Sequence, residues 1–205
     1  EFAEADAKAY SAALRLGMVT DTQDTEGTVL SQCDVAVSDA QLNAALARFR
    51  GEIAQIPPMY SAIKVNGQKL CNLARKGREV ERPARNITIF SLERVGTDEN
   101  GDILLDVVCS KGTYIRTLCN DIGAALGCGG VMSALRRTRA GTFTLERAHT
   151  LDDVLAAAAR GEAEKLLLPV ETLFSDHSAL TLSAAQEKAV RNGAGFTYPG
   201  EEGTY

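Results

Sequence analysis

Hydrophobic and polar residues follow two different periods along the chain. Alternation with a period of two predicts strands, whereas apolar residues spaced three and four apart predict helices. Strands are predicted over residues 8–17, 28–37, 59–65, 84–95, 102–109, 131–139 and 141–145. Helices are predicted from the Ser38 capping box to Gly51, over 68–76, over 113–126, from Thr150 to Arg160 and over 183–191. Mixed strands and helices with hairpins indicate an α+β fold rather than a doubly wound parallel sheet.

Two runs of turn-forming residues indicate how neighbouring segments pair. Residues 98–101 (Asp-Glu-Asn-Gly) join the strands on either side of them into the clearest hairpin of the sequence. One face of the first of these strands carries Ile87, Ile89 and Ser91. Asn66-Gly67 predicts a second tight turn. The hairpins favour antiparallel pairing.

The composition is that of a globular chain. The 205 residues are 45% hydrophobic and 24% charged, which is enough to bury a core and excludes a disordered tail or a coiled coil. No apolar run reaches the length of about eighteen residues that a transmembrane helix needs. The chain starts with acidic residues instead of a signal peptide and has no initiator Met. We therefore expect it to begin inside a longer protein.

The cysteines and histidines do not follow the spacing of a disulfide framework or a metal site. The five cysteines are odd in number and contain no Cys-x-x-Cys pair. We interpret them as small buried hydrophobic residues in a reducing cytoplasm. The two histidines, His149 and His177, are not spaced as metal ligands, so no metal site is predicted.

The charge is unevenly distributed. The net charge is −5, which alone argues against general nucleic-acid binding. Residues 61–90, however, hold seven basic and two acidic side chains, and residues 110–140 hold five basic and one acidic. Such segregation is typical of a basic face that contacts a polyanion such as RNA or DNA. The alternative is that both basic runs form solvated surface with acidic partners from elsewhere in the chain.

Three segments combine aromatic and basic residues in a way that suggests chemistry. In Lys8-Ala9-Tyr10, the tyrosine is either a core residue or a platform on which a base stacks. Residues 57–67 and the following helix place Lys64 and Arg75 on a hairpin and a helix end. Residues 109–118 end a strand, turn at a glycine and open a helix with Tyr114 and Arg116. Because an arginine there opposes the helix dipole, a buried anionic partner is expected.

Together these segments resemble the TruB family of tRNA pseudouridine synthases. The resemblance spans residues 8–153 and its motifs occur in order. They are Lys8-Ala9-Tyr10, Leu16-Gly17, Thr20-Asp21-Thr22-x-Asp24-x-x-Gly27, Phe49-x-Gly51, residues 55–64 (Gln-Ile-Pro-Pro-Met-Tyr-Ser-Ala-Ile-Lys), residues 110–118 (Ser-Lys-Gly-Thr-Tyr-Ile-Arg-Thr-Leu) and Leu135-Arg136-Arg137.

The resemblance implies a mixed, largely antiparallel sheet with flanking helices, and an isomerase that converts the T-loop uridine of tRNA (position 55) to pseudouridine. Tyr10 would stack on the everted base, Arg116 would pair with the catalytic Asp, and Tyr114 would act at C5. Leu135 would form the pocket wall, and the RNA would also contact basic residues. These are Lys64, Arg75, Lys111 and Arg136. The expected partner is the T arm of tRNA, bound by a cytoplasmic monomer without cofactor, metal or membrane.

One motif of the family is missing. Its catalytic Asp belongs to a Gly-x-Leu-Asp-Pro motif upstream of the segment that matches Lys8-Ala9-Tyr10, and this sequence contains no Leu-Asp-Pro. We therefore expect the chain to lack an N-terminal segment and to be inactive by itself. Asp21 and Asp24 match a different motif and are given no catalytic role.

The C-terminal part suggests a second module. The composition changes near residues 175–182, and the tail resembles the beginning of the small RNA-binding PUA domain of many family members. We expect a catalytic domain over residues 1–178 and the start of a PUA-like domain over 179–205.

Two other hypotheses remain open. Without its Asp, the protein could be a tRNA-binding or RNA-folding module that performs no chemistry. Alternatively, the basic runs could serve internal salt bridges in a plain globular domain, which predicts no salt-dependent affinity for RNA.

Overall fold

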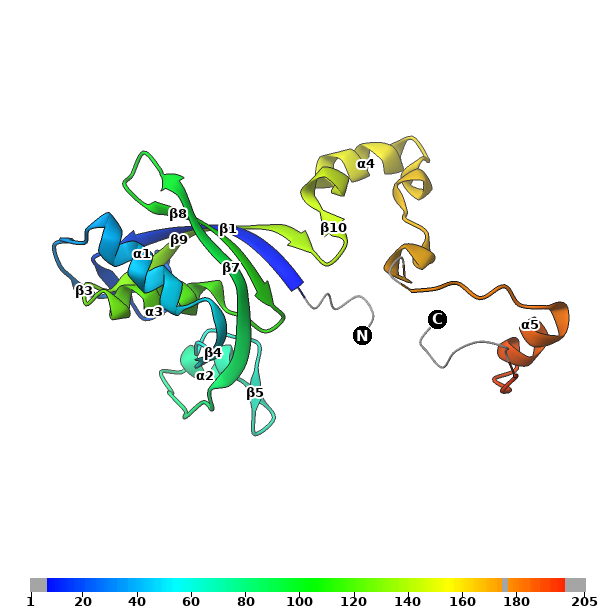
Figure 1. Ribbon diagram of the computed structural model, residues 1–205, viewed down its shortest axis with the longest axis horizontal. Coiled ribbons are helices and arrows are strands. Elements are labelled where there is room, and N and C mark those ends of the chain that lie inside the picture. Colours follow the sequence, from blue (N-terminus) through cyan, green and yellow to red (C-terminus); the bar gives the residue numbers. More distant parts are fainter. Residues whose placement is uncertain (1–6, 175–176, 198–205) are drawn as a thin grey trace. The chain divides into compact units, whose positions relative to one another are not determined.

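The chain divides into two compact units in a computed structural model that describes residues 7–174 and 177–197 (Figure 1). One unit ends at Ala148 and the other begins at His149. The domain boundary predicted from the sequence, between residues 178 and 179, lies within the second unit and stays a prediction.

The first unit is built on a six-stranded sheet with the order β10-β9-β1-β8-β7-β4, in which every neighbouring pair of strands is antiparallel. Its strands are β1 (Ala7–Leu16), β4 (Gly51–Gln55), β7 (Arg85–Thr97), β8 (Ile103–Ser110), β9 (Gly130–Ala140) and β10 (Phe143–Thr144). Two small antiparallel pairs accompany it: β2 (Met18–Thr20) with β3 (Val29–Gln32), and β5 (Lys64–Val65) with β6 (Gln68–Lys69). The predicted α+β fold with a largely antiparallel sheet is confirmed.

Two helices pack on one face of this sheet. Helix α1 (Asp39–Arg48) begins at the predicted Ser38 capping box and buries Leu42, Ala45 and Leu46. Helix α3 (Ile115–Ala125) buries a stripe at helical spacing, and helix α2 (Leu70–Ala74) is short. The core joins the inward residues of the strands to both long helices. It includes Tyr10, Leu14, Leu46, Ile89, Leu92, Leu105, Cys109, Ile115, Leu118 and Ile122.

The second unit contains only helical elements among its described residues. These are α4 (Leu151–Ala159), two 3-10 turns at Ala163–Leu166 and Val170–Phe174, and α5 (Ala184–Arg191); a further 3-10 turn at Leu145–Arg147 belongs to the first unit. Helices α4 and α5 confirm the helices predicted there, and both begin with complete capping boxes, from Thr150 and Ser183. The end of the predicted PUA-like segment, residues 198–205, lies outside the described residues.

Several predicted segments differ from the structure. The helix expected over 68–76 is limited to α2, because residues 68–69 pair as β6, and the strand expected over 141–145 is reduced to β10. The strand expected over 59–65 is wrong except for β5, because Pro57 and Pro58 lack N–H donors and residues 59–62 form bends. The strand expected over 28–37 is reduced to β3. In β7, the register shifts between Ile89 and Ser91, so the inward position passes to the fully buried Leu92 instead of Ser91.

The prediction that all cysteines are buried is wrong for three of the five. Cys109 and Cys119 are buried, Cys71 and Cys128 are half-buried, and Cys33 is exposed in the extended segment that follows β3. Burial raises the pKa of the Cys119 thiol to about 12, so this side chain behaves as an inert core residue.

Backbone contact between two glycines sets the position of α3 on the sheet. A Cβ added to Gly123 would lie 2.1 Å from the backbone nitrogen of Gly130, and one added to Gly130 would lie 2.8 Å from the Cys119 carbonyl oxygen. Backbone atoms cannot move aside as a flexible side chain would. The helix therefore approaches β9 as closely as it does only because both positions lack side chains.

We expect Gly123→Ala to destabilise the protein by about 1–3 kcal/mol through overpacking, despite the higher helix propensity of alanine. Urea unfolding measures the change. Gly96→Ala in β7 is the control, because its Cβ would meet only a Leu104 methyl at 3.9 Å. Equal stability of the two variants would contradict the close approach of α3 to β9.

An ion pair ties the far end of β1 to the β7–β8 hairpin. Arg15 donates from Nε and Nη2 to the two carboxylate oxygens of Asp102, at 2.8 Å each. Burial raises the pKa of Asp102, but hydrogen bonds from Arg15 and Ser133 and the Arg15 charge outweigh it, so the net pKa is lowered. The stabilisation is therefore present above the ordinary pKa range of Asp and is lost as the pH falls through the lowered value.

We expect Asp102→Asn to cost about 1–3 kcal/mol at neutral pH. The difference from the unmodified protein begins to shrink below about pH 4, where Asp102 takes up a proton in the unfolded state, and it goes on shrinking until the pH falls below the lowered pKa of the folded state. Urea unfolding from pH 3 to 7 measures it. Asp106→Asn is the control, since Asp106 is exposed and bonds only Ser11; a difference that stays constant with pH would contradict this account.

Candidate functional site

The start of helix α3 is fixed by a glutamine from the edge strand. Gly112 turns the chain after β8 with a φ of 83°, a conformation that favours glycine. The buried Gln55 side chain then donates to the Tyr114 carbonyl at 3.1 Å and accepts from the Tyr114 N–H at 2.9 Å. Tyr114 has no side-chain cap of its own. This clamp holds the N-terminus of α3, and with it Arg116, against the sheet.

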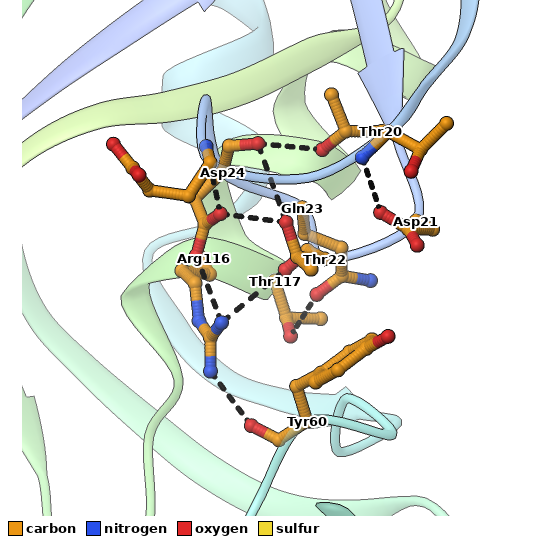
Figure 2. Close-up of polar contacts among 10 residues, drawn as sticks. Thr20, Asp21, Thr22, Gln23, Asp24, Tyr60, Arg116 and Thr117 are labelled. Carbon is orange, nitrogen blue, oxygen red and sulfur yellow. Dashed lines mark hydrogen bonds and ion pairs between the residues drawn. The ribbon is translucent and has the colours of Figure 1, made fainter. Parts of the chain in front are cut away.

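The Arg116 guanidinium joins three segments that are distant in the sequence (Figure 2). Its Nη1 donates to Asp24 Oδ2 at 2.8 Å and to the Thr22 carbonyl at 3.4 Å. Its Nη2 donates to the Tyr60 carbonyl at 2.7 Å. The Arg116 and Asp24 side chains are only 23% and 16% exposed, so water screens the pair weakly. The anionic partner that the sequence predicts for Arg116 is found within this chain.

The loop that carries Asp24 is held by its own polar side chains. Thr22 Oγ1 donates to Asp24 Oδ1 at 2.6 Å, and Thr20 Oγ1 donates to the Asp24 carbonyl at 2.7 Å. Gln23 lies between them with a φ of 65°, which is unusual for a residue other than glycine, and accepts from Thr117 Oγ1 at 2.7 Å. The side chain of Asp24 is thus fixed before any ligand binds.

Tyr10 lies on the face of the sheet that the helices cover. It is only 8% exposed, and the guanidinium carbon of Arg137 lies 5.6 Å from its ring centroid. Tyr10 pairs with Arg137 across β1 and β9, and Ala12 pairs with Leu135. Because residues opposite each other in an antiparallel pair share a face, Leu135 and Arg137 lie on the same side as Tyr10. Leu135 is 45% exposed there.

The predicted RNA-binding residues fall into separate places. Lys64 and Arg75 line one depression of about 490 Å³ together with Lys69 and Lys76, so the structure brings these two together. Lys111 lines a different depression, at the end of β8. Arg136 pairs with Ser11, next to Tyr10 in the strand, so its side chain points to the opposite face of the sheet. The structure does not bring Arg136 to the side of the sheet on which Tyr10 and α3 lie.

A pocket of about 370 Å³ with a mixed polar and apolar lining borders the Arg116 network. Its lining includes Asp21, Gln23, Met59, Tyr60, Arg82 and Asn120. Asn120 lies one turn after Arg116 on α3, and Tyr60 provides the carbonyl that Arg116 binds. The pocket is thus lined by an aromatic residue, amide side chains and residues of both charges. Together they offer hydrogen-bond donors and acceptors, which the edge of a nucleobase requires.

Within residues 7–174 and 177–197, no group of three His, Cys, Asp or Glu side chains is placed to hold a metal ion. No helix in the same ranges is long and apolar enough to span a membrane.

Sequence analysis missed three participants in this site. Asp24 was given no role, although Thr22, Glu26 and Arg116 all donate to its carboxylate. Gln55 and Arg137 act through contacts between distant segments, which local spacing does not reveal. All three residues lie in motifs that carry the family resemblance, and the arginine at the start of a helix called for an anion without indicating which one.

Two family models together match most of the chain. Residues 1–115 match the model described as TruB family pseudouridylate synthase (N terminal domain). Residues 116–175 match the model described as tRNA pseudouridylate synthase B C-terminal domain. The Arg116 network therefore combines residues from both matched regions.

Curated proteins named tRNA pseudouridine synthase B are similar along most of this chain. The protein from Ralstonia pickettii (strain 12J) is 48% identical over 189 residues, covering 91% of this chain and 59% of the relative. The protein from Burkholderia mallei (strain NCTC 10247) is 50% identical over 182 residues, covering 89% of this chain and 59% of the relative. The chain thus spans about three fifths of the length of these relatives.

Solved structures with the same fold are Cbf5 complexes and related particles. A Cbf5-Nop10-Gar1 complex matches with a TM-score of 0.60 and 28% identity, over 83% of this chain and 44% of the other. An H/ACA RNP bound to a substrate RNA containing 2'-deoxyuridine matches with a TM-score of 0.55 and 25% identity, over 83% and 42%.

We expect Arg116→Lys to destabilise the protein by about 1–3 kcal/mol, because a single ammonium group cannot replace a planar fork that binds three segments. Hydrogen exchange at the Thr25 amide, which bonds the Met132 carbonyl across the loop, accelerates in the same variant. The control is Arg191→Lys, whose pair with Glu187 is 76% and 55% exposed. Unchanged stability and exchange in Arg116→Lys would contradict the bridging role.

Proposed function

The chain belongs to the TruB family of pseudouridylate synthases, and from this premise we propose that the complete protein isomerises the T-loop uridine of tRNA to pseudouridine. The observation that carries the proposal is that Tyr10 and the first turn of α3, with Tyr114 and Arg116, contribute to one side of the same sheet. In this proposal the aromatic ring supports the base, and the guanidinium holds the catalytic carboxylate.

The reaction rearranges bonds within one nucleotide. The bond from C1′ to N1 breaks, the base turns, and a bond from C1′ to C5 forms as the proton leaves C5. Atoms and electrons balance without a redox partner, so the protein's own groups can carry out every step. A stacked base is out of reach, and everting it costs a few kcal/mol.

Tyr10 supports the everted base in this proposal. Stacking on an aromatic ring contributes about 1–3 kcal/mol per base, which offsets much of the cost of eversion. Arg137 lies over the ring in the free protein. The guanidinium therefore swings aside when the base arrives, and Leu135, on the same face, contacts the base from the neighbouring strand.

Arg116 holds the carboxylate that attacks the substrate. The catalytic Asp of the family belongs to a motif that is not in this sequence, so we propose that the complete protein provides it. The contacts in the structure use Nη1 and Nη2 of Arg116 for Asp24, Thr22 and Tyr60, and Nε donates to no described residue. A second carboxylate can approach from the Nε side while Asp24 fixes the guanidinium plane.

Tyr114 has the third role in this proposal. The Gln55 clamp fixes its backbone two residues before Arg116, so both residues belong to one fixed segment. We propose that it assists removal of the C5 proton, directly or through a water molecule. The T arm of tRNA is the proposed partner, bound by a monomer in the cytoplasm, and Lys64 and Arg75 extend the contact along the RNA backbone.

The test uses the complete protein and tRNA transcribed without modification. We expect pseudouridine in the T loop, with single-turnover rates at least about 100-fold lower in Arg116→Ala, because the attacking carboxylate loses its charged partner. Asp24→Asn lowers the rate as well, since the guanidinium loses its anchor. Both variants retain affinity for tRNA, which comes mostly from phosphate contacts elsewhere.

Control and alternative outcomes separate the hypotheses. Arg160→Gln changes an exposed cation in the second unit and leaves the rate unchanged. Tight tRNA binding without product would favour the non-catalytic binding module. Absence of salt-dependent binding would favour the plain globular domain.

A further inference from the structure

A basic depression lies at one end of the main sheet, outside the Arg116 network. It has a volume of about 500 Å³ and forms where β1 and β7 begin and β8 ends. Its lining consists of Lys8, Arg85, Asn86, Ile87, Lys111 and Gly112. Three of these six residues are cationic, and no Asp or Glu is among them.

The strand register places two of the cations on the inner face of the sheet. Lys8 pairs with the buried Cys109, and cross-strand partners share a face. Arg85 precedes the buried Ile87 by two residues in β7, so it points to that same face. Burial raises the pKa of the Cys109 thiol and the charge of Lys8 lowers it in part, which agrees with an ammonium group close to this strand end.

The depression adjoins the residues proposed to hold the uridine. Lys8 and Tyr10 are two residues apart on one face of β1, a separation of about 7 Å. Arg85 pairs with Gln55, the residue that clamps the backbone of Tyr114. An anion in the depression would therefore lie next to a nucleotide whose base stacks on Tyr10.

Lys8 and Arg85 differ from five arginines of the sheet unit that are paired with acidic side chains. Arg15, Arg50, Arg82, Arg94 and Arg116 each form an ion pair with a carboxylate. Lys8 and Arg85 form no ion pair with any described residue. Two such charges that line one depression repel each other, and a shared anion relieves that repulsion.

We propose that this depression binds one backbone phosphate of the substrate RNA, adjacent to the everted uridine. A phosphodiester fits because its two free oxygens can accept the fork of Arg85 and the ammonium of Lys8 together. Clamping the phosphate next to the target fixes the sugar whose C1′ reacts. The inference rests on the proposed function for the identity of the RNA, and its charge chemistry is tested separately.

The first experiment measures the salt dependence of RNA affinity. The complete protein, Lys8→Gln, Arg85→Gln and the double variant bind a T-arm stem-loop RNA at 50–300 mM KCl. Each single variant weakens binding about threefold to tenfold, and the slope of log K against log salt falls in magnitude by about 0.7–0.9 once the phosphate contact is lost. The double variant loses little more than the worse single variant, because both side chains hold one group.

A matched control removes a cation of the same unit away from the depression. Arg48→Gln, at the exposed C-terminal end of α1, leaves the slope unchanged. Thermal unfolding of each variant shows whether it is folded. Folded Lys8→Gln and Arg85→Gln variants with the slope of the unmodified protein would overturn the proposal.

The second experiment locates the phosphate. Uncharged methylphosphonate linkages replace the phosphates flanking the target uridine one at a time. One replacement weakens binding to the unmodified protein but not to Arg85→Gln, since that variant has already lost the contact. Equal weakening in both proteins at every position would overturn the proposal. A free phosphate ion is the alternative ligand, and it is tested by adding inorganic phosphate at constant ionic strength. Strong competition with RNA binding at millimolar phosphate would mean that the depression holds a free phosphate rather than the RNA backbone.

The outcomes also separate this inference from the proposed function. If the unmodified protein forms pseudouridine but the salt slope is the same in Lys8→Gln and Arg85→Gln as in the unmodified protein, only the phosphate site is refuted. If the salt slope falls in these variants but the unmodified protein forms no pseudouridine, the phosphate site is supported and the isomerase activity is refuted. With an active enzyme, the variants raise KM more than they lower kcat, as expected for a binding contact.

Discussion

The site depends on one guanidinium that links two distant parts of the chain to the helix that carries it. Arg116 fixes the loop at Asp24, the bend at Tyr60 and the first turn of α3 relative to one another. The first two of these segments are short and irregular, whereas α3 is anchored in the core. A planar guanidinium has several N–H donors in fixed directions, so it can hold several partners in place at once. An ammonium group, whose donors rotate freely, cannot do this. The geometry of the site is thus set by charge-assisted hydrogen bonds within a frame built by packing.

That frame depends on how closely α3 approaches the sheet. Gly123 and Gly130 allow backbone to meet backbone, and Gln55 clamps the other end of the helix at Tyr114. The helix is therefore held at both ends by different means, one steric and one polar. Between these ends, Ile115, Leu118 and Ile122 enter the common core. A shift of the helix along its axis would break the clamp and the glycine contact together.

Much of the fold could be predicted from local patterns. The capping boxes at Ser38 and Thr150 and the turn at Asn66-Gly67 act within a few residues, so their signals lie in the sequence itself. The bulge that brings Leu92 into the core could not be predicted, because it depends on the register of the partner strand. Strand β4 was missed for a similar reason, since it forms only by pairing with β7 at the edge of the sheet.

The site was predicted less completely than the fold. The charge of Arg116 and its place at a helix start predicted an anion, and that part of the prediction needed only local physics. Which anion it meets depends on a loop more than ninety residues earlier in the chain, where Thr22 and Gln23 orient Asp24. Arg137 was grouped with neighbouring basic residues, but its contact with Tyr10 follows from the pairing of β1 with β9.

The contact between Arg137 and Tyr10 has a consequence for discrimination among ligands. In the free protein, the guanidinium of Arg137 from the neighbouring strand lies over the Tyr10 ring, where a base would stack. Any base that reaches the ring must displace this cation, which contributes about 0.5–2 kcal/mol when it lies over an aromatic face. A base that arrives alone gains little from the exchange. A base that is attached to a polyanion gains more, because the displaced guanidinium can then turn to the nucleic-acid backbone. In the proposed function, the resting contact would therefore favour a base that is part of an RNA strand over an isolated nucleobase.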